Sequence, residues 1–131
     1  MIFIDSGIPM YLVGAPHPNK DAALRVLNAL IEAGERLVSD VEVLEEILHR
    51  YTSIDRRDAI QPAFDALLGI VDELYAIDLA DIQRARQQLL RTSSVSAREA
   101  LHLAVMQRHG ITRILSLDRG FDAVSGVQRL G

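Results

Sequence analysis

Hydrophobic and polar residues follow two patterns that alternate along the chain. Short apolar runs, typical of strands buried on both faces, are separated by longer segments in which apolar residues return every three or four positions. The apolar runs predict buried strands at residues 1–4, 37–39, 74–77 and 111–117. The last residues, Gly126–Gly131, predict one short edge strand.

The segments between these runs have the spacing of amphipathic helices. Helices are predicted over Asp21–Ala33, after Asp40 as N-cap, over Gln61–Val71, after Asp78 as N-cap and over Ala97–His109. Gly34 and Gly110 are predicted to end the first and the last of these helices. The residues predicted to face inward on the first, second and fourth of these helices are Leu24, Leu27 and Ile31; Leu44, Ile47, Leu48 and Tyr51; and Ile82, Ala85 and Leu89.

Strands that alternate with helices predict an α/β fold, because parallel neighbours need helical crossovers. We expect a three-layer α/β/α sandwich with a central, mainly parallel sheet of four to five strands. The 131 residues fit one domain, and the sequence has neither an internal repeat nor an interdomain linker. The predicted organisation is therefore a single domain over residues 1–131.

The composition is that of a globular protein, with 49% hydrophobic and 24% charged residues. The absence of Cys excludes disulfides, thiolate metal sites and cysteine nucleophiles, and agrees with a reducing compartment. No apolar run approaches the roughly 18 residues of a spanning helix, and no signal peptide is indicated at the N-terminus. We therefore expect a cytoplasmic protein without a membrane association.

The charge pattern limits how the chain could bind nucleic acid. Its formal net charge is −4, only 5% of residues are aromatic and there is no Trp. A global cationic field and a stacking platform are thus missing. Phosphate binding would need metal ions, a local Arg cluster or a partner chain.

Acidic residues directly follow three of the predicted strands. These are Asp5, Asp40 and Asp118. Ligands of open parallel sheets bind at the carboxyl ends of the strands, and several carboxylates at one edge repel each other unless hard cations neutralise them. The pattern favours a site for Mg²⁺ or Mn²⁺, which prefer oxygen ligands.

An Asp after a strand is also an ordinary helix cap or turn residue. Asp40 suits this structural role best, because a helix opens directly at Val41. Asp5 is harder to explain in this way, since Ser6-Gly7-Ile8-Pro9 supplies turn and start signals of its own.

Four segments together resemble the PIN domains, and in particular the VapC-like toxins of bacterial toxin–antitoxin pairs. They are Met1-Ile2-Phe3-Ile4-Asp5-Ser6, the acidic helix Glu42–Arg50, Ser96–Ala104 and Leu115–Phe121. The last two segments are the most specific, and the resemblance spans nearly the whole chain. It implies a ribonuclease that uses acidic residues and Mg²⁺ or Mn²⁺ to hydrolyse RNA phosphodiester bonds. It also implies a VapB-like antitoxin and a homodimer.

The resemblance carries over to individual positions. Asp5 matches the first acidic position and Asp118 the late one. On the acidic helix Glu46 is favoured because Ile47 follows it, with Glu45 as the alternative. The remaining position falls on Glu99. We thus expect Asp5, Glu46, Glu99 and Asp118 as catalytic residues, with Asp5, Glu99 and Asp118 as metal ligands.

Two residues depart from the family pattern. Glu99 stands where Asp is more usual, and Ser96 with Glu99 forms an S-x-x-E capping box, so this carboxylate has a competing structural role. Gly7 stands where Asn or Ser is common and cannot supply their hydrogen bond. Ser6 keeps a hydroxyl beside Asp5, either to hold that carboxylate or to form an ST-turn.

Further residues could approach the site. Asp122 could add a carboxylate, and Arg98, next to Glu99, could contact an RNA phosphate. His102 lies on the same helical face as Glu99, where it is either a packing residue or part of the site. Arg84, Arg86 and Arg91 are expected to solvate a helix surface.

Other functions fit less well. A receiver-like signalling domain would need an adjacent acidic pair after the first strand and a Lys in the C-terminal half, but Lys20 is the only lysine. A phosphatase with a nucleophilic Asp would usually have a second acid where this chain has Gly7. The remaining alternative is a PIN-like binding or assembly module, in which Gly7 and Glu99 mark a weakened site.

Overall fold

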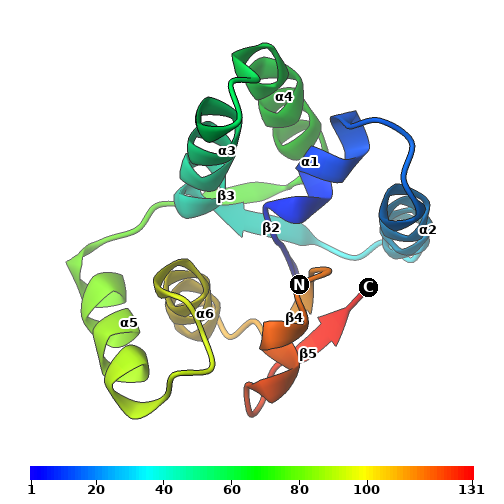
Figure 1. Cartoon of the computed structure of the whole chain (residues 1–131). Helices are drawn as coiled ribbons and strands as arrows, with labels where there is room; N and C mark the ends of the chain where they lie inside the picture. Colours follow the sequence, from blue (N-terminus) through cyan, green and yellow to red (C-terminus); the bar gives the residue numbers. More distant parts are fainter.

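A five-stranded parallel sheet forms the centre of the computed structural model, which describes residues 1–131 (Figure 1). The strands are β1 (Ile2–Ile4), β2 (Leu37–Asp40), β3 (Glu73–Tyr75), β4 (Arg113–Leu115) and β5 (Gln128–Leu130). Their order is β3-β2-β1-β4-β5, and every neighbouring pair is parallel.

Helices cover both faces of this sheet. They are α1 (Gly7–Val13), α2 (Pro18–Glu32), α3 (Val41–Ser53), α4 (Ile60–Ile70), α5 (Leu79–Arg91) and α6 (Ala97–Arg108), with 3-10 turns η1 (Arg57–Ala59) and η2 (Arg119–Ala123). Helices α1 to α4 pack together on one side, and α5 packs on α6 on the other (Figure 1). None of these helices has the length and hydrophobicity of a membrane-spanning segment. The predicted α/β/α sandwich with a parallel sheet is confirmed.

The strand order creates a switch point in the middle of the sheet. From β1 the chain moves outward through β2 to β3, and then returns on the other face to place β4 beside β1. Ile4 pairs with Leu115, and the Asp5 N–H donates to the Leu115 carbonyl at 3.1 Å. The carboxyl ends of β1 and β4 therefore open at one place, where ligands of such sheets bind.

Consecutive residues of the central strands are buried, as expected for strands covered on both faces. Ile2, Phe3 and Ile4 of β1 and Ile114 and Leu115 of β4 have no exposed surface. Helices α3, α5 and α6 begin at side-chain caps: Asp40 accepts from the Val43 N–H, and capping boxes join Asp78 to Asp81 and Ser96 to Glu99. These caps determine where each of the three helices starts, and with it the positions of the residues in its first turn.

The structure adds one helix that the sequence pattern did not predict. Helix α1 follows Ser6, within the segment whose start signals were noted, but it has only seven residues. Helix α2 begins at Pro18, earlier than predicted, because the His17 ring accepts from the Asn19 N–H and caps it. The other helices and strands differ from prediction by a few residues at their ends.

The inward prediction is confirmed for Leu27, Ile47, Tyr51 and Ala85 and is wrong for four other residues. Ile31 and Leu48 are exposed, because α2 turns Ala23 and Leu27 inward and α3 turns Val43, Ile47 and Tyr51 inward. On α5 the predicted Ile82 is 47% exposed and Leu89 is also exposed, whereas Ala85 is buried. The physical reason is that α5 packs on α6 rather than on the sheet, so only a narrow face is covered.

Candidate functional site

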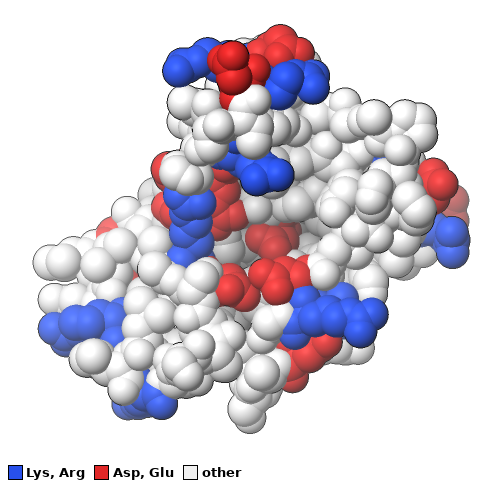
Figure 2. All heavy atoms as spheres, viewed as in Figure 1, with Lys and Arg blue, Asp and Glu red and all other residues white.

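A polar cavity of about 150 Å³ lies at the switch point between β1 and β4. It has no hydrophobic lining; its residues are Asp5, Ser6, Glu46, Ser96, Arg98, Glu99, His102 and Asp118. Figure 2 shows acidic atoms in the hollow at the centre of this face, with Lys and Arg side chains around it. The four carboxylates expected as catalytic residues are thus brought together.

Asp5 is held at the end of β1 by two hydrogen bonds. Its Oδ1 accepts from the Ser6 N–H at 2.8 Å, and its Oδ2 accepts from the Ser116 hydroxyl at 2.5 Å. Burial raises the pKa of Asp5, although His102 and the Ser116 hydrogen bond act in the opposite direction. Burial makes the ionised form of this carboxylate unfavourable, and a nearby cation would stabilise that form.

Ser116 also positions Asp118. The Asp118 N–H donates to the Ser116 Oγ at 3.0 Å, and the Asp118 Oδ1 accepts from the Gly120 N–H at 2.9 Å. One buried serine after β4 therefore connects the two acidic residues at the carboxyl ends of β1 and β4.

Glu99 fulfils its predicted capping role with one carboxylate oxygen and leaves the other free at the cavity. Its Oε1 accepts from the Ser96 N–H at 2.9 Å, which completes the capping box of α6. Its Oε2 is buried and has no hydrogen-bond partner. A Cβ built on Gly120 would lie 3.0 Å from this oxygen and 3.2 Å from the Asp118 Oδ1, so both carboxylates border the same small space.

Of the three acids on α3, only Glu46 lines the cavity. Burial acts to raise its pKa, but the hydrogen bond and positive charge of His102 outweigh it and lower the pKa. Glu42 and Glu45 instead pair with Arg98, at 3.5 and 3.4 Å. Burial, with Glu45 beside it, raises the pKa of Glu42 to about 7.

His102 is fully buried between two carboxylates. Its Nδ1 lies 2.8 Å from the Asp40 Oδ2 and its Nε2 lies 2.7 Å from the Glu46 Oε1. Burial opposes protonation, but the two hydrogen-bonded carboxylates raise the pKa of His102 well above its usual value. The ring also packs against Phe3, with centroids 5.2 Å apart, so the packing interpretation is confirmed, and the ring also lines the polar cavity.

The cap predicted at Asp40 is confirmed, but this residue does more. Its Oδ1 caps α3 while its Oδ2 faces His102. No sequence pattern indicates the second contact, because Asp40 and His102 are 62 residues apart.

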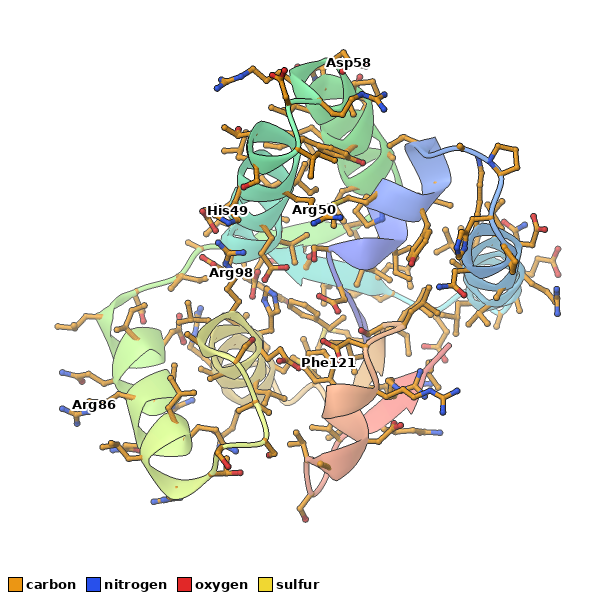
Figure 3. All side chains as sticks on the ribbon, in the orientation of Figure 1. His49, Arg50, Asp58, Arg86, Arg98 and Phe121 are labelled. Atoms are coloured by element: carbon orange, nitrogen blue, oxygen red, sulfur yellow. The ribbon has the colours of Figure 1, made fainter.

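The further residues considered for the site, Ser6, Arg98 and Asp122, divide between the cavity and the surface. Ser6 and Arg98 line the cavity, and Figure 3 shows Arg98 projecting from α6 toward α3. Asp122 does not, because it forms an ion pair with Arg129 at 2.8 Å. Arg86 points outward from α5 (Figure 3), as expected for a solvated surface residue.

The donor set of the cavity fits a hard divalent cation. Asp5 and Glu46 each offer a carboxylate oxygen, and these two atoms and a ring nitrogen of His102 lie within 4.8 Å of one another. Glu99 adds a buried oxygen without a partner. Carboxylate oxygens of this kind suit Mg²⁺ or Mn²⁺, whereas the site has no thiolate and only one imidazole.

Comparisons with known proteins agree with this architecture. The family model described as PIN domain matches residues 2–127. Ribonuclease VapC13 of Mycobacterium tuberculosis is 58% identical over 130 residues, 99% of each chain. Ribonuclease VapC23 of the same species is 36% identical over 118 residues, covering 90% of this chain and 93% of the relative.

Solved structures show the same fold at low sequence identity. Mycobacterium tuberculosis VapC20, a toxin that cleaves the sarcin–ricin loop, superposes with a TM-score of 0.78 at 22% identity and covers 95% of each chain. VapBC2 from Rickettsia felis, bound to a promoter DNA fragment, superposes with a TM-score of 0.74 at 12% identity, covering 99% of this chain and 98% of that one.

Proposed function

The chain belongs to the PIN-domain family and is a VapC-like toxin, and on this basis we propose that it is an Mg²⁺- or Mn²⁺-dependent ribonuclease that hydrolyses RNA phosphodiester bonds. Residues 1–131 would form a single PIN domain. The observation that carries the proposal is the convergence of Asp5, Glu46, Glu99 and Asp118 on one polar cavity at the switch point.

Each carboxylate has a proposed role. Asp5, Glu99 and Asp118 would hold the metal, and Glu46 would complete the acidic set from α3. Ser116 holds Asp5 and the backbone of Asp118 in place. When bound, the ion would polarise the scissile phosphate and lower the pKa of an attacking water. No nucleophilic side chain is needed.

One arginine at the cavity supports an RNA substrate. Arg98 lines the cavity, its side chain is 38% exposed, and Glu42 and Glu45 orient it from α3. We propose that Arg98 contacts a phosphate of the bound strand, where a guanidinium can donate two hydrogen bonds.

The decisive experiment is RNA cleavage by the purified chain. A cellular RNA pool is incubated with the wild-type chain, Asp5→Asn or Asp118→Asn, with Mg²⁺ or Mn²⁺ or with EDTA, and new RNA ends are sequenced. Asp58→Asn is the matched control, because Asp58 lies far from the cavity at the outer end of the α3–α4 pair (Figure 3). We expect cleavage by wild type and control only, and only with metal.

Absence of cleavage, or equal cleavage by the folded Asp5→Asn and Asp118→Asn variants, would refute the nuclease function. A PIN-like binding or assembly module would then be the better description. The geometry favours the nuclease, since Glu99 keeps one carboxylate oxygen free at the cavity despite its capping role.

The relatives also suggest a partner. Several structural neighbours are complexes of a toxin with its antitoxin, including VapBC2 and a toxin–antitoxin complex from Klebsiella pneumoniae. We propose that a VapB-like antitoxin binds this chain and blocks cleavage, and that both act in the cytoplasm. Induced expression of the chain should arrest bacterial growth, and co-expression of the antitoxin from the neighbouring reading frame should restore it.

We further propose a homodimer formed through α5 and α6. An apolar groove of about 300 Å³ lies between these helices; Leu90 in its lining is 81% exposed, and Leu79 at the start of α5 is 71% exposed. A contiguous apolar surface of this kind marks an interaction site. The second copy would cover the apolar residues that α5 leaves exposed.

A further inference from the structure

His102 links two elements of the site that are distant in sequence. It comes from α6, one turn after Glu99, and reaches across the carboxyl edge of the sheet to Asp40 at the end of β2 and to Glu46 on α3. We propose that His102 is a positioning residue of the acidic site, which holds the Glu46 carboxylate in place for metal binding while Asp40 anchors the imidazole. This inference rests on the proposed metal-dependent function.

The anchor is rigid because Asp40 is fixed twice. Its Oδ1 accepts from the Val43 N–H at 3.0 Å and its Oδ2 is 2.8 Å from the His102 Nδ1, while the residue has no exposed surface. Phe3 packs against the imidazole ring. The imidazole of His102 is therefore held at both ring nitrogens and packed on one face, and it has little freedom to rotate.

The hydrogen-bond pattern fixes what His102 can do. Each ring nitrogen lies within hydrogen-bond distance of a carboxylate oxygen, Nδ1 beside Asp40 and Nε2 beside Glu46. Both nitrogens thus already have carboxylate partners, so His102 acts on the site through Glu46 rather than as a metal ligand of its own. His102 supports Glu46 in the way that second-shell partners orient metal ligands in other proteins.

His102 also brings the carboxylates of two elements together. Its Nε2 lies 3.9 Å from the Asp5 Oδ1 and 2.7 Å from the Glu46 Oε1. The ring thus stands between the end of β1 and α3, where the two acids would otherwise repel each other. Removing it should separate these carboxylates and weaken cation binding.

The test compares two substitutions of His102, each of which can retain one of the two hydrogen bonds of the imidazole. The amide of His102→Asn can reach the position of Nδ1 and keep the bond to Asp40, whereas the longer His102→Gln can place a donor near Nε2 and keep the bond to Glu46. His49→Asn, at an exposed position of α3 outside the cavity, is the matched control. Mn²⁺ binding is titrated by electron paramagnetic resonance, RNA cleavage is measured separately, and thermal unfolding checks the fold.

We expect His102→Asn to raise the Mn²⁺ half-saturation concentration about 10- to 100-fold, the usual cost of losing a second-shell partner. The Mn²⁺ half-saturation concentration of His102→Gln should be within a few-fold of the wild-type value, and that of His49→Asn should equal it. The Mn²⁺ spectrum of protein labelled with ¹⁵N-histidine should show no directly bonded nitrogen.

Three results would overturn the positioning role: equal Mn²⁺ binding by His102→Asn and His49→Asn, a direct Mn–N coupling to histidine, or a wild-type chain that binds no Mn²⁺. If His102→Asn does not fold, Asp40→Asn takes its place, because Asn still caps α3 but presents a donor to the ring. An unchanged Mn²⁺ half-saturation concentration in Asp40→Asn would also refute the positioning role. A wild-type chain that binds Mn²⁺ without cleaving RNA refutes only the nuclease function.

Discussion

Gly120 offers the most direct test of how tightly the acidic site is built. A Cβ at this position would lie 3.0 Å from the Glu99 Oε2 and 3.2 Å from the Asp118 Oδ1, both shorter than the 3.4 Å at which ordinary contact begins. In Gly120→Ala the two oxygens must therefore move by a few tenths of an ångström. Both belong to proposed metal ligands.

The expected signature is a loss of function without a loss of stability. Displaced ligands should weaken Mn²⁺ binding and RNA cleavage about tenfold or more, which corresponds to about 1.4 kcal/mol or more. The free energy of unfolding should stay within about 1 kcal/mol of wild type, because Ala restricts the unfolded chain and offsets part of the local strain. Urea denaturation, Mn²⁺ titration and initial cleavage rates separate these effects.

Gly69→Ala is the matched control, since a Cβ there meets nothing within 4 Å and the residue lies in helix α4. It should increase stability by up to about 1 kcal/mol and leave cleavage unchanged. Wild-type Mn²⁺ affinity and cleavage in Gly120→Ala would refute the claim that the space beside Gly120 belongs to the metal site.

Three further predictions follow from other contacts. Ser116→Ala should reduce cleavage and Mn²⁺ affinity about tenfold, because Asp5 loses its hydroxyl donor; unchanged activity in the folded variant would contradict this. Arg108→Ala should lower the free energy of unfolding by about 2 kcal/mol near neutral pH, since it leaves the buried Asp81 carboxylate without two donors. Burial acts to raise the pKa of Asp81, but Arg108 and the capping box lower it below its usual 3.8. The stability that they provide is present above pH 3.8 and declines as the pH falls through the lowered pKa. The difference in the free energy of unfolding between wild type and Arg108→Ala, measured with urea, should therefore shrink below about pH 4. Leu90→Glu should convert the proposed dimer to a monomer in analytical ultracentrifugation, and a persistent dimer would place the interface elsewhere.

The acidic residues at the strand ends could be predicted from the sequence because two independent signals coincide there. An apolar run followed by Asp predicted both the strand and the acid at its end for Asp5 and Asp118, and the parallel arrangement brought them to one edge. Glu46 and Glu99 needed the family resemblance, since helical spacing alone does not distinguish Glu46 from Glu45.

Contacts between distant elements could not be predicted in this way. The bond of His102 to Asp40 depends on how α6 is rotated and on where it crosses the end of β2. Periodicity failed for α5 for a related reason: it identifies the apolar face of a helix, but not whether the same chain covers it. The seven-residue α1 is too short to develop a periodic signal.

Asp40 and Glu99 each use one carboxylate oxygen to cap a helix and leave the other for the site or its support. A free glutamate loses up to about 2 kcal/mol of rotamer entropy when it is immobilised. In this chain much of that loss is incurred when the helices form, so binding a cation need not incur it again. The helix starts thereby preorganise the cavity, and fraying of the first turn of α6 would disable the site before the fold itself is lost.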